Sequence, residues 1–329
     1  MQSIFQKIWR GIKDPFQQGF SSLCYQGFHF AHSLLLPEGV AKDACLLKAG
    51  YRKSMRRNLS LENPQKFTEK IQWLKLYDRN PLHTMKADKY AVREFVKNTI
   101  GEQHLVELFG VYDRPEEIDF DALPDRFVLK STHGCGMSIV CPDKNQLDRK
   151  AVVKKFNRWL KINWYYKSKR QWAYKDIPPR IICEEFLESN TDWGLLDYKF
   201  FCLNGKPEYI QVIFDRTGRE ERFQNLYDTQ WNRLSVTTSG FPINPKNVPP
   251  PPCLDEMLRL ASALAKDIIF SRVDFYYHND KIIFGEITFY PAGGVNRFNP
   301  VEFDDELGRK LKLPFELNIR NNAKSGEQT

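Results

Sequence analysis

The chain lacks the cysteine and histidine spacings of zinc proteins. Its 329 residues include seven cysteines, but these form no CxxC pair and no cluster with histidine at zinc spacing. Several lie inside apolar runs, as free thiols of a reducing compartment do. No run approaches the roughly 18 consecutive apolar residues of a membrane-spanning helix. Charged residues interrupt the apolar ones at the N-terminus, so there is no signal-peptide pattern, and we expect a cytoplasmic protein.

Common nucleotide-binding motifs are also missing. The sequence contains neither the GK[ST] of a P-loop nor the GxGxxG of a dinucleotide-binding fold. It contains no recognised DNA- or RNA-binding motif, so we expect no nucleic-acid partner. The net charge of +8 nevertheless favours an anionic partner, such as a nucleotide, a uronic-acid polymer or a phospholipid surface.

Residues 271–291 form the most informative segment. Two runs rich in Val, Ile, Phe and Tyr flank a His-Asn-Asp-Lys turn, which predicts a β-hairpin. Because strand side chains alternate between faces, Arg272 and Asp274 share one face, and Glu286 and Thr288 share a face on the returning strand. Two carboxylates and a hydroxyl are ligands that Mg²⁺ accepts from a protein. The alternative is an ordinary solvated face of an amphipathic hairpin.

A second segment has the character of a phosphate-binding loop. Lys130 ends a predicted strand, and His133, Gly134 and Gly136 follow in the loop before the next strand. A lysine beside a glycine-rich loop can place an ammonium group and backbone N–H groups around phosphate oxygens. The alternative is a plain hairpin turn. Upstream, Lys89 and Arg93 are four residues apart in a predicted helix, so we expect both on one face, within reach of one anion.

The remaining pattern predicts an α+β fold. Helical spacing extends over 67–97, 149–164 and 254–267, and strands are expected at 126–130, 138–141 and 180–187. A further hairpin, 198–203 with 208–214, turns at Asn204-Gly205. Strand pairs that alternate with helices favour α+β lobes over a doubly wound parallel sheet. Residues 4–12 predict a short basic amphipathic helix, which either docks on the protein's own core, as we favour, or lies on an anionic membrane.

Together these segments resemble the ATP-grasp superfamily, and within it the TupA-like family of bacterial surface-polysaccharide synthesis. The resemblance covers about residues 60–314 and is carried by 67–75, 87–93, 127–130, 197–201, 272–274 and 285–291. It implies an ATP-grasp fold, in which two α+β lobes grip ATP. The divisions would be a helical N-terminal extension (1–60), a mainly helical region (61–125), a small lobe (126–190) and a large lobe with the metal site (191–329).

The resemblance also implies roles for individual residues. Arg93 and Lys130 match the two phosphate-contacting lysines of the superfamily, with Lys89 beside them, and the loop from His133 through Gly134 to Gly136 would close over the phosphates. The hinge whose backbone reads the adenine would be Glu184, Glu185, Phe186 and Leu187. Substrate-facing cations would be Lys199, Arg216 and Arg222, and Arg272 would stabilise the anionic intermediate. Asp274 and Glu286 match the metal ligands, and Thr288 stands where the superfamily usually has asparagine.

The activity implied by the resemblance is that of an ATP-dependent carboxylate–amine ligase with an acyl-phosphate intermediate. The cofactors would be ATP and Mg²⁺, with Mn²⁺ as an alternative ion. The substrates would be a carboxylate, such as a uronic-acid glycan, and an amine or amino acid, in surface or capsular polysaccharide biosynthesis. One alternative is a metal-dependent glycosyltransferase of the same biosynthesis. Another is a nucleotide-binding scaffold for glycan assembly that contacts the inner membrane face through residues 1–15.

Overall fold

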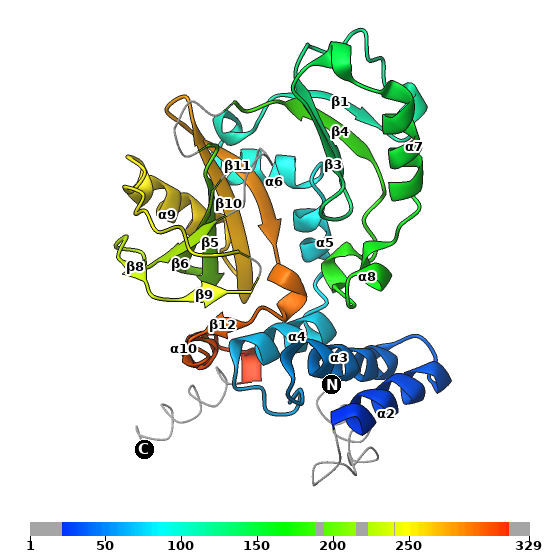
Figure 1. Cartoon of the computed structure of the whole chain (residues 1–329), viewed down its shortest axis with the longest axis vertical. Helices are drawn as coiled ribbons and strands as arrows, with labels where there is room; N and C mark the ends of the chain where they lie inside the picture. The colour runs from blue at the N-terminus through cyan, green and yellow to red at the C-terminus, as the bar shows by residue number, and fades with distance from the viewer. Residues whose placement is uncertain (1–21, 189–193, 215–222, 240, 316–329) are drawn as a thin grey trace. The chain divides into compact units, whose positions relative to one another are not determined.

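The computed structural model describes residues 22–188, 194–214, 223–239 and 241–315 (Figure 1). Contacts divide the chain into two compact units, Met1–Ser60 and Leu61–Thr329. In the first unit, helices α2 (Ser22–Leu35) and α3 (Val40–Met55) pack against each other. The amphipathic helix expected at residues 4–12 lies outside the described residues. No helix in the described part of the chain is both long enough and apolar enough to cross a membrane.

The second unit begins with three helices where the sequence predicted one continuous helical stretch. They are α4 (Phe67–Tyr77), α5 (Pro81–Ala87) and α6 (Val92–Ile100). Pro81 cannot continue a helix but is well suited to start one, and the Asn80 side chain caps α5 by accepting from Leu82 N. Between α5 and α6, Asp88 Oδ1 accepts from the backbone N–H of Tyr90 at 2.8 Å. This local bond competes with the helix and produces a turn.

That turn overturns one prediction about the site. Lys89 lies in the turn, whereas Arg93 lies in the first turn of α6. The two side chains therefore do not share a helix face, and each contacts a different carboxylate, Glu286 for Lys89 and Glu184 for Arg93.

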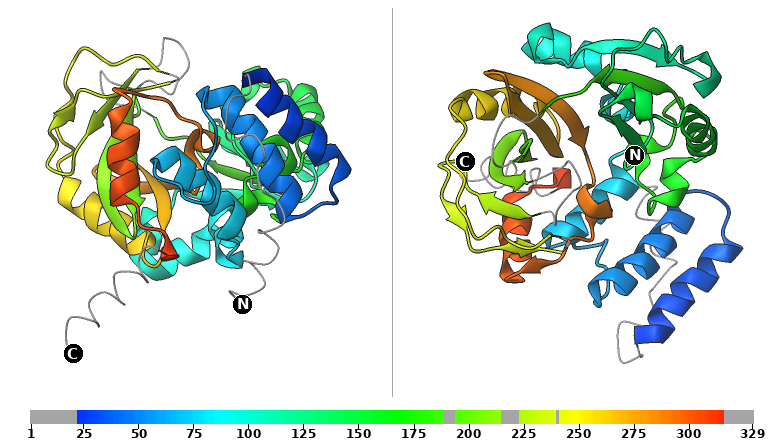
Figure 2. Two further views of the ribbon diagram at one scale, coloured as in Figure 1. Left: turned by 90° about the horizontal axis from the view of Figure 1, so that it is seen from below. Right: turned by 45° about the horizontal axis from the view of Figure 1, so that its top comes forward.

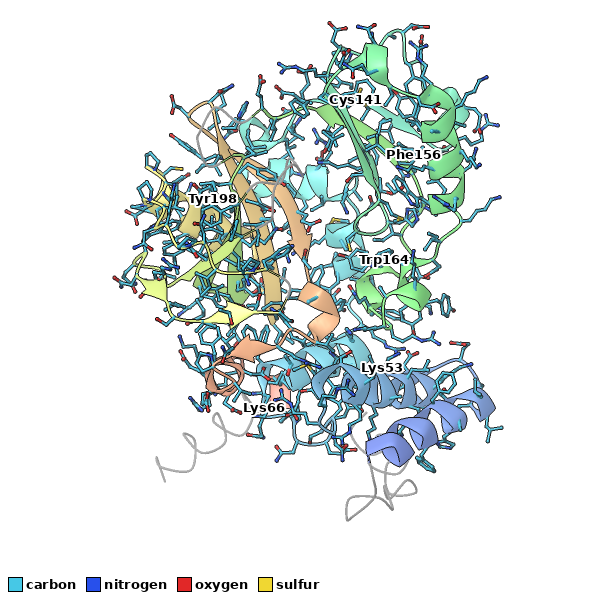
Figure 3. All side chains as sticks on the ribbon, viewed as in Figure 1. Lys53, Lys66, Cys141, Phe156, Trp164 and Tyr198 are labelled. Carbon is cyan, nitrogen blue, oxygen red and sulfur yellow. The ribbon has the colours of Figure 1, made fainter. Side chains whose placement is uncertain are left out.

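A four-stranded antiparallel sheet follows, in the order β1-β4-β2-β3. Its strands are β1 (Leu108–Tyr112), β2 (Phe127–Ser131), β3 (Ser138–Cys141) and β4 (Ile181–Glu185), so the three predicted strands are confirmed to within two residues. Helix α7 (Arg149–Trp159) covers one face (Figure 1), with Phe156 on that helix (labelled in Figure 3). Phe127, Leu129 and Phe156 are fully buried in this core. Lys130 and Glu184 alternate with these core positions and therefore lie on the other face.

Helix α7 ends five residues before the predicted boundary at 164. The chain leaves the helix after Trp159 and forms a short second helix, α8 (Trp164–Lys167), which Asn163 caps by accepting from Tyr165 N. The apolar spacing continues across this break, which explains the overestimate. Four 3₁₀ turns complete this part of the chain: η1 (Glu102–His104), η2 (Pro115–Glu117), η3 (Lys144–Gln146) and η4 (Trp172–Tyr174).

The larger sheet has six strands in the order β11-β10-β5-β6-β7-β8, and every pairing is antiparallel. Both predicted hairpins are confirmed in it. One is β5 (Asp197–Leu203) with β6 (Lys206–Ile213), and the other is β10 (Phe270–His278) with β11 (Lys281–Thr288). The strands β7 (Gln224–Tyr227) and β8 (Arg233–Leu234) complete this sheet, and β9 (Thr237–Thr238) pairs separately with β12 (Phe298–Asn299).

The six-stranded sheet has one apolar and one polar face at its centre. Helix α9 (Leu254–Leu264), shorter than the predicted 254–267, packs on β5, β6 and β10 (Figures 1 and 2). Phe200, Val273 and Phe275 are fully buried in this core. Lys199, Arg272 and the other polar residues alternate with them along the strands and occupy the opposite face. The site described below is built on that polar face.

Helix α4 fixes the segment that follows the second hairpin. Its Gln72 donates to Gly294 O at 2.7 Å, and buried Lys75 donates to Gly293 O at 2.5 Å, in the turn η5 (Pro291–Gly294). At its N-terminus, α4 is capped from α10 (Glu302–Lys310), because Asp304 accepts from Thr68 N at 2.9 Å and from Thr68 Oγ1 at 2.8 Å. These bonds hold η5 at the end of β11, beside the polar face.

Candidate active site

The centre of the site is a row of residues that lie directly opposite one another on neighbouring strands. Glu286 of β11 pairs with Asp274 of β10, Asp274 with Lys199 of β5, and Lys199 with Gln211 of β6. A bulge brings Glu286 into this row, because Asp274 pairs with Glu286 whereas the next pair is Phe275 with Phe284. Gly285 is the extra residue at this bulge.

Arg272 joins the predicted metal ligands to one another. Its Nε and Nη2 donate to the two Asp274 carboxylate oxygens, both at 2.7 Å. Nη2 also lies 2.9 Å from Glu286 Oε1 and 3.1 Å from Thr288 Oγ1. The hairpin therefore brings together all four of its predicted residues, with the guanidinium at their centre.

Burial and charge act in opposition on these groups. Burial lowers the pKa of Arg272, but the neighbouring carboxylates Asp274 and Glu286 outweigh it and hold the pKa above its ordinary value. Burial raises the pKa of Asp274, and Arg272 and Lys199 offset only part of that increase. The Asp274 side chain is 2% exposed, whereas Glu286 is 30% exposed. Glu286 is therefore the carboxylate that a ligand can reach most easily.

Lys199 connects this cluster to a residue that the sequence did not predict for the site. Its Nζ lies 2.5 Å from Asp274 Oδ2 and 2.6 Å from Asp197 Oδ2. Asp197 is completely buried, two residues before Lys199 on the same face of β5. The sequence did contain a signal for Asp197. It stands two residues before Lys199, a predicted substrate-facing lysine, and residues two apart on a strand share a face.

A second cluster of charges lies on the four-stranded sheet. Glu184 accepts from Lys130 Nζ at 2.6 Å and is paired with Arg93 Nη1 at 3.2 Å. Arg93 also donates to Val106 O at 2.8 Å. The two residues predicted to contact phosphate are thus held by one buried carboxylate. Glu184, predicted as part of the hinge, has its side chain in this cluster.

Lys89 connects the glycine-rich loop to the six-stranded sheet. Its Nζ donates to Gly134 O at 2.6 Å and lies 3.8 Å from Glu286 Oε2. Its backbone N–H donates to Thr132 O at 3.3 Å, which fixes the turn against the same loop. Through Lys89, the loop that contains Gly134 and Gly136 is linked to Glu286 of the β10–β11 hairpin.

Several other predicted residues stand apart from these clusters. The His133 side chain is buried, and its Nε2 lies 3.2 Å from Trp159 O. It therefore packs against the C-terminal end of α7. Glu185 is exposed, and Phe186 stacks under the Arg126 guanidinium at 5.6 Å. Leu187 is half-buried in the segment between β4 and β5, the connection between the two sheets. Arg216 and Arg222 lie outside the described residues.

The residues at the hairpin fit a divalent metal ion such as Mg²⁺. Asp274 and Glu286 supply hard carboxylate oxygens, and Thr288 Oγ1 lies 3.2 Å from Glu286 Oε1. Among the described residues, no group of three or more His, Cys, Asp or Glu side chains has metal-binding geometry. A set with only two carboxylates suits Mg²⁺, which usually keeps positions for water and for substrate phosphates.

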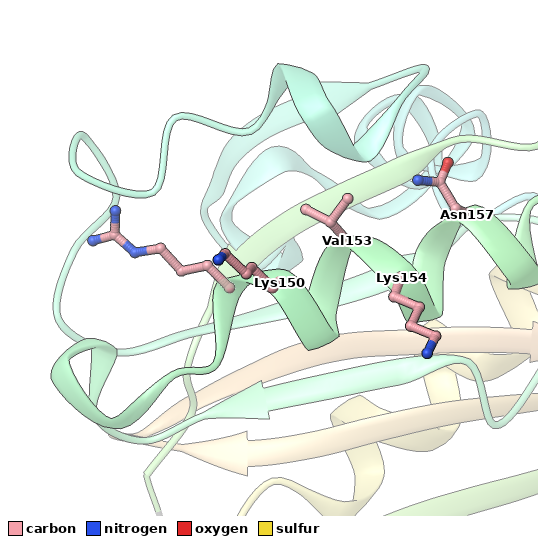
Figure 4. A pocket seen from close by; sticks show the side chains of 5 residues that line it. Lys150, Val153, Lys154 and Asn157 are labelled. Carbon is pink, nitrogen blue, oxygen red and sulfur yellow. The ribbon is translucent and has the colours of Figure 1, made fainter.

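A cavity of about 220 Å³ adjoins this cluster on the polar face of the six-stranded sheet. Lys199, Arg272 and Asp197 line one part of it, and Gln211, Thr238 and Asn296 line another. A separate, wider hollow of about 520 Å³ lies on α7 and is lined by Arg149, Lys150, Val153, Lys154 and Asn157 (Figure 4). Because none of these five residues belongs to the charged clusters, we place the site at the smaller cavity.

Comparison with known proteins identifies a family. The family described as "TupA-like ATPgrasp" matches residues 69–312. None of the curated proteins matches the chain.

Solved structures with similarity include D-alanine–D-alanine ligase from Bacillus anthracis complexed with ATP, with 13% identity over 62% of this chain and 55% of that one, and a TM-score of 0.38. The ligase from Helicobacter pylori has 12% identity over 75% and 70%, with a TM-score of 0.40. The D-cycloserine synthetase DcsG has 14% identity over 70% and 72%, with a TM-score of 0.39. The chain thus spans 55% of the length of the Bacillus enzyme.

The family match extends over well more than half of the chain and contains both charged clusters. It also agrees with the mixed helices and antiparallel sheets of the structure and with the predicted α+β class. The chain belongs to the TupA-like ATP-grasp family and has the ATP-grasp fold.

Proposed function

We propose that this protein is an ATP-dependent ligase that joins a carboxylate to an amine. The observation that carries the proposal is the Arg272 cluster, in which one buried guanidinium contacts both carboxylates and the hydroxyl of a predicted metal site. A cavity adjoins that cluster, and Lys130 on the other sheet and Arg93 on α6 would supply cations for phosphate oxygens. Membership of the ATP-grasp family supports ATP as the nucleotide.

The charge balance of the site supports a metal-bound nucleotide. Around the hairpin, Lys89, Lys199 and Arg272 are balanced by Asp197, Asp274 and Glu286. The polyphosphate of ATP would therefore add uncompensated negative charge. Asp274, Glu286 and Thr288 would hold Mg²⁺, which supplies positive charge beside the β- and γ-phosphates when it is bound.

The reaction that this arrangement supports has two steps. A carboxylate oxygen forms a bond to the γ-phosphorus, and the bond between that phosphorus and the β–γ bridging oxygen breaks, releasing ADP. The amine nitrogen then attacks the acyl carbon, the bond to phosphate breaks, and the protons that the nitrogen loses pass to phosphate and water. Arg272 would stabilise the oxyanion of the second step, a role typically worth about 10²–10³ in rate.

We further propose that the carboxylate belongs to a uronic-acid glycan or its precursor in surface or capsular polysaccharide biosynthesis. This part depends on the family association. The basic net charge of +8 supports it, because it favours anionic polymers as partners.

A hydroxamate assay tests the ligase activity. Protein, Mg²⁺–ATP, a uronic acid and hydroxylamine should yield hydroxamate and ADP in equal amounts. Glu286→Gln should abolish both products with the fold intact, whereas Glu256→Gln, on the surface of α9, should leave both unchanged. UDP release from a UDP-sugar without hydroxamate would favour a glycosyltransferase instead. ATP binding without turnover of either kind would favour a scaffold.

A further inference from the structure

The positive charge of this protein is concentrated in one segment. Of the 49 lysines and arginines, ten lie in residues 149–175, which contain no aspartate or glutamate, and this leaves 39 basic against 41 acidic residues in the rest of the chain. The segment holds α7, α8 and η4, and the structure describes all of it. The net charge of +8 therefore arises from this segment.

Helix α7 presents a row of these cations to solvent. Lys150, Lys154 and Arg158 are exposed and recur every four residues, so they lie on one face of the helix, about 6 Å apart along its axis. None of the three forms an ion pair with any residue that the structure describes. Their neighbour Arg149, by contrast, is paired with Asp121 at 2.6 Å. Lys150 and Lys154 also line the hollow of about 520 Å³ on α7 (Figure 4), so uncompensated charge lies beside an open recess.

The row of cations continues beyond the end of α7 to a second cavity. Exposed Lys161 lines this cavity of about 230 Å³ together with Trp164, and most of the other lining side chains are apolar. The Trp164 ring packs on the glycine-rich loop, since a Cβ added at Gly134 would lie 3.0 Å from it. The charged face of α7 thus leads to the loop that Lys89 links to Glu286.

These features match an extended anion built of rings. Lysine is a compact point charge with rotatable donors, which suits carboxylates spaced along a chain. A polymer of uronic acids carries a carboxylate on each sugar unit, so its charge repeats along its length as the cations repeat along α7. The C–H face of a sugar ring is apolar and can pack on an aromatic ring such as that of Trp164. The cavity of about 230 Å³ is smaller than the roughly 300–1,000 Å³ of pockets for drug-sized ligands, which suits one sugar unit.

Two other kinds of polyanion match this surface less well. Single-stranded nucleic acid is bound by cations together with exposed aromatic rings, on which successive bases stack. Of the seven aromatic residues in 149–175, all of which the structure describes, Tyr166 is the one that is exposed, at 54%. Helices that bind an anionic membrane turn an apolar face to the lipid. The apolar residues Val152 and Phe156 of α7 are instead buried against the sheet.

We infer that the exposed face of α7 and the cavity at Trp164 form a binding surface for an acidic polysaccharide, separate from the ATP site. Lys150, Lys154 and Arg158 would bind carboxylates of successive sugar units. One sugar ring would pack on Trp164, beside the glycine-rich loop. The choice of a glycan rests on the proposed function, but binding to this surface requires no turnover and is tested by itself.

The test measures binding of a fluorescently labelled galacturonic-acid oligomer to the full chain by anisotropy, without nucleotide. A galactose oligomer of the same length, which has no carboxylates, is the matched probe. We expect saturable binding of the acidic oligomer only, and loss of that binding at about 1 M salt, where the Debye length is about 3 Å. The triple variant Lys150→Gln/Lys154→Gln/Arg158→Gln should weaken binding about 10-fold or more, the combined effect of three exposed ion pairs.

The control variant Lys206→Gln/Lys266→Gln/Lys281→Gln removes the same charge from exposed positions at the starts of β6 and β11 and after α9, and should leave the affinity unchanged. Absence of binding, equal binding of the galactose oligomer, or equal weakening by the two triple variants would each overturn the inference. Tighter binding of a single-stranded oligonucleotide or of phosphatidylglycerol vesicles would overturn it too. The hydroxamate assay with a monomeric uronic acid reports on the ligase proposal separately, and the α7 variant should leave its rate unchanged.

Discussion

Arg272 and Asp274, two residues apart on one strand, form a bidentate ion pair with both distances at 2.7 Å. The same guanidinium contacts Glu286 and Thr288 on the neighbouring strand. Because one cation holds all three oxygen-bearing side chains, the candidate metal ligands are oriented together, and disturbance of Arg272 should disturb all of them.

We expect Arg272→Met to lower the free energy of unfolding by about 3–5 kcal/mol, since it leaves buried Asp274 without its main partner. Urea unfolding at pH 7.5 measures this. Arg259→Met removes an exposed arginine from α9, paired only with Glu256, and should leave the unfolding midpoint almost unchanged. Equal effects of the two variants would show that the Arg272 pair does not stabilise the sheet.

Lys130→Met should raise the KM for ATP by 10-fold or more in the ligase assay, because Lys130 would contact phosphate oxygens. Glu184 would keep Arg93 as its partner, so the fold should tolerate the change. Lys97→Met, at an exposed position of α6, removes a lysine that is paired with Glu102 at 3.0 Å. It is the control and should leave the KM for ATP unchanged. An unchanged KM for Lys130→Met would remove this residue from the nucleotide site.

Gly285→Ala should lower both activity and stability. A Cβ there would lie 3.1 Å from Asp274 O and 3.2 Å from Tyr276 Cε2, so the bulge that brings Glu286 opposite Asp274 must shift. We expect a cost of about 1–2 kcal/mol in unfolding free energy, in the range of overpacking substitutions. Gly50→Ala, inside α3, places its new Cβ more than 4 Å from every described atom other than its chain neighbours and its own helix backbone, and should instead stabilise that helix. Wild-type activity in Gly285→Ala would contradict the role of the bulge.

Asp78→Asn should stabilise the protein at neutral pH. Burial raises the pKa of Asp78 from 3.8 to about 6, and the residue caps the C-terminus of α4, where negative charge is unfavourable. His83, 3.8 Å away, does not compensate, because burial and then Lys86 lower its pKa to about 4. Between pH 3.8 and about 6 the folded chain keeps a proton that the unfolded chain releases, so the Asp78 contribution to stability falls as pH rises through this interval.

The expected gain for Asp78→Asn at pH 7.5 is about 1–2 kcal/mol, less than the full shift would give, since the side chain is 22% exposed. At pH 4 the gain should disappear, and urea unfolding at both pH values measures the difference. Asp255→Asn, in the first turn of α9, is the control of opposite sign, because a carboxylate there is favourable to the helix. A gain that is the same at both pH values would contradict the titration.

Asp304→Ala should destabilise the second unit by about 1–3 kcal/mol, because buried Thr68 N loses its acceptor at the start of α4. Asp305→Ala, at the next position, removes only a partly exposed pair with Lys66 and should cost about 1 kcal/mol or less. Thermal unfolding of the two variants in parallel checks the difference. A larger loss for Asp305→Ala would show that the cap is unimportant.

The parts of the site that the sequence predicted best depend on local geometry. The alternation along two strands and the His-Asn-Asp-Lys turn between them sufficed to place Arg272, Asp274, Glu286 and Thr288 together. The same kind of inference failed for Lys89 and Arg93. The two residues are four apart, as one helix face requires, but the Asp88 side chain accepts from Tyr90 N and fixes a turn that contains Lys89, before α6 begins. A side-chain bond to the local backbone is not visible in apolar periodicity.

The sequence by itself determined the strands β2, β3 and β4, the two hairpins of the larger sheet, the polar face of the second hairpin and the family, because these follow from alternation and from short ordered motifs. Only the tertiary structure decided the partners of these residues. Asp274 beside Lys199, Glu184 between Lys130 and Arg93, and the hydrogen bonds of Gln211 and Thr238 to buried Gln224 join residues from separate strands and helices. The side-chain amide of buried Gln224, for example, donates to Thr238 O and Phe241 O, and only the packing of those segments against β7 fixes its orientation.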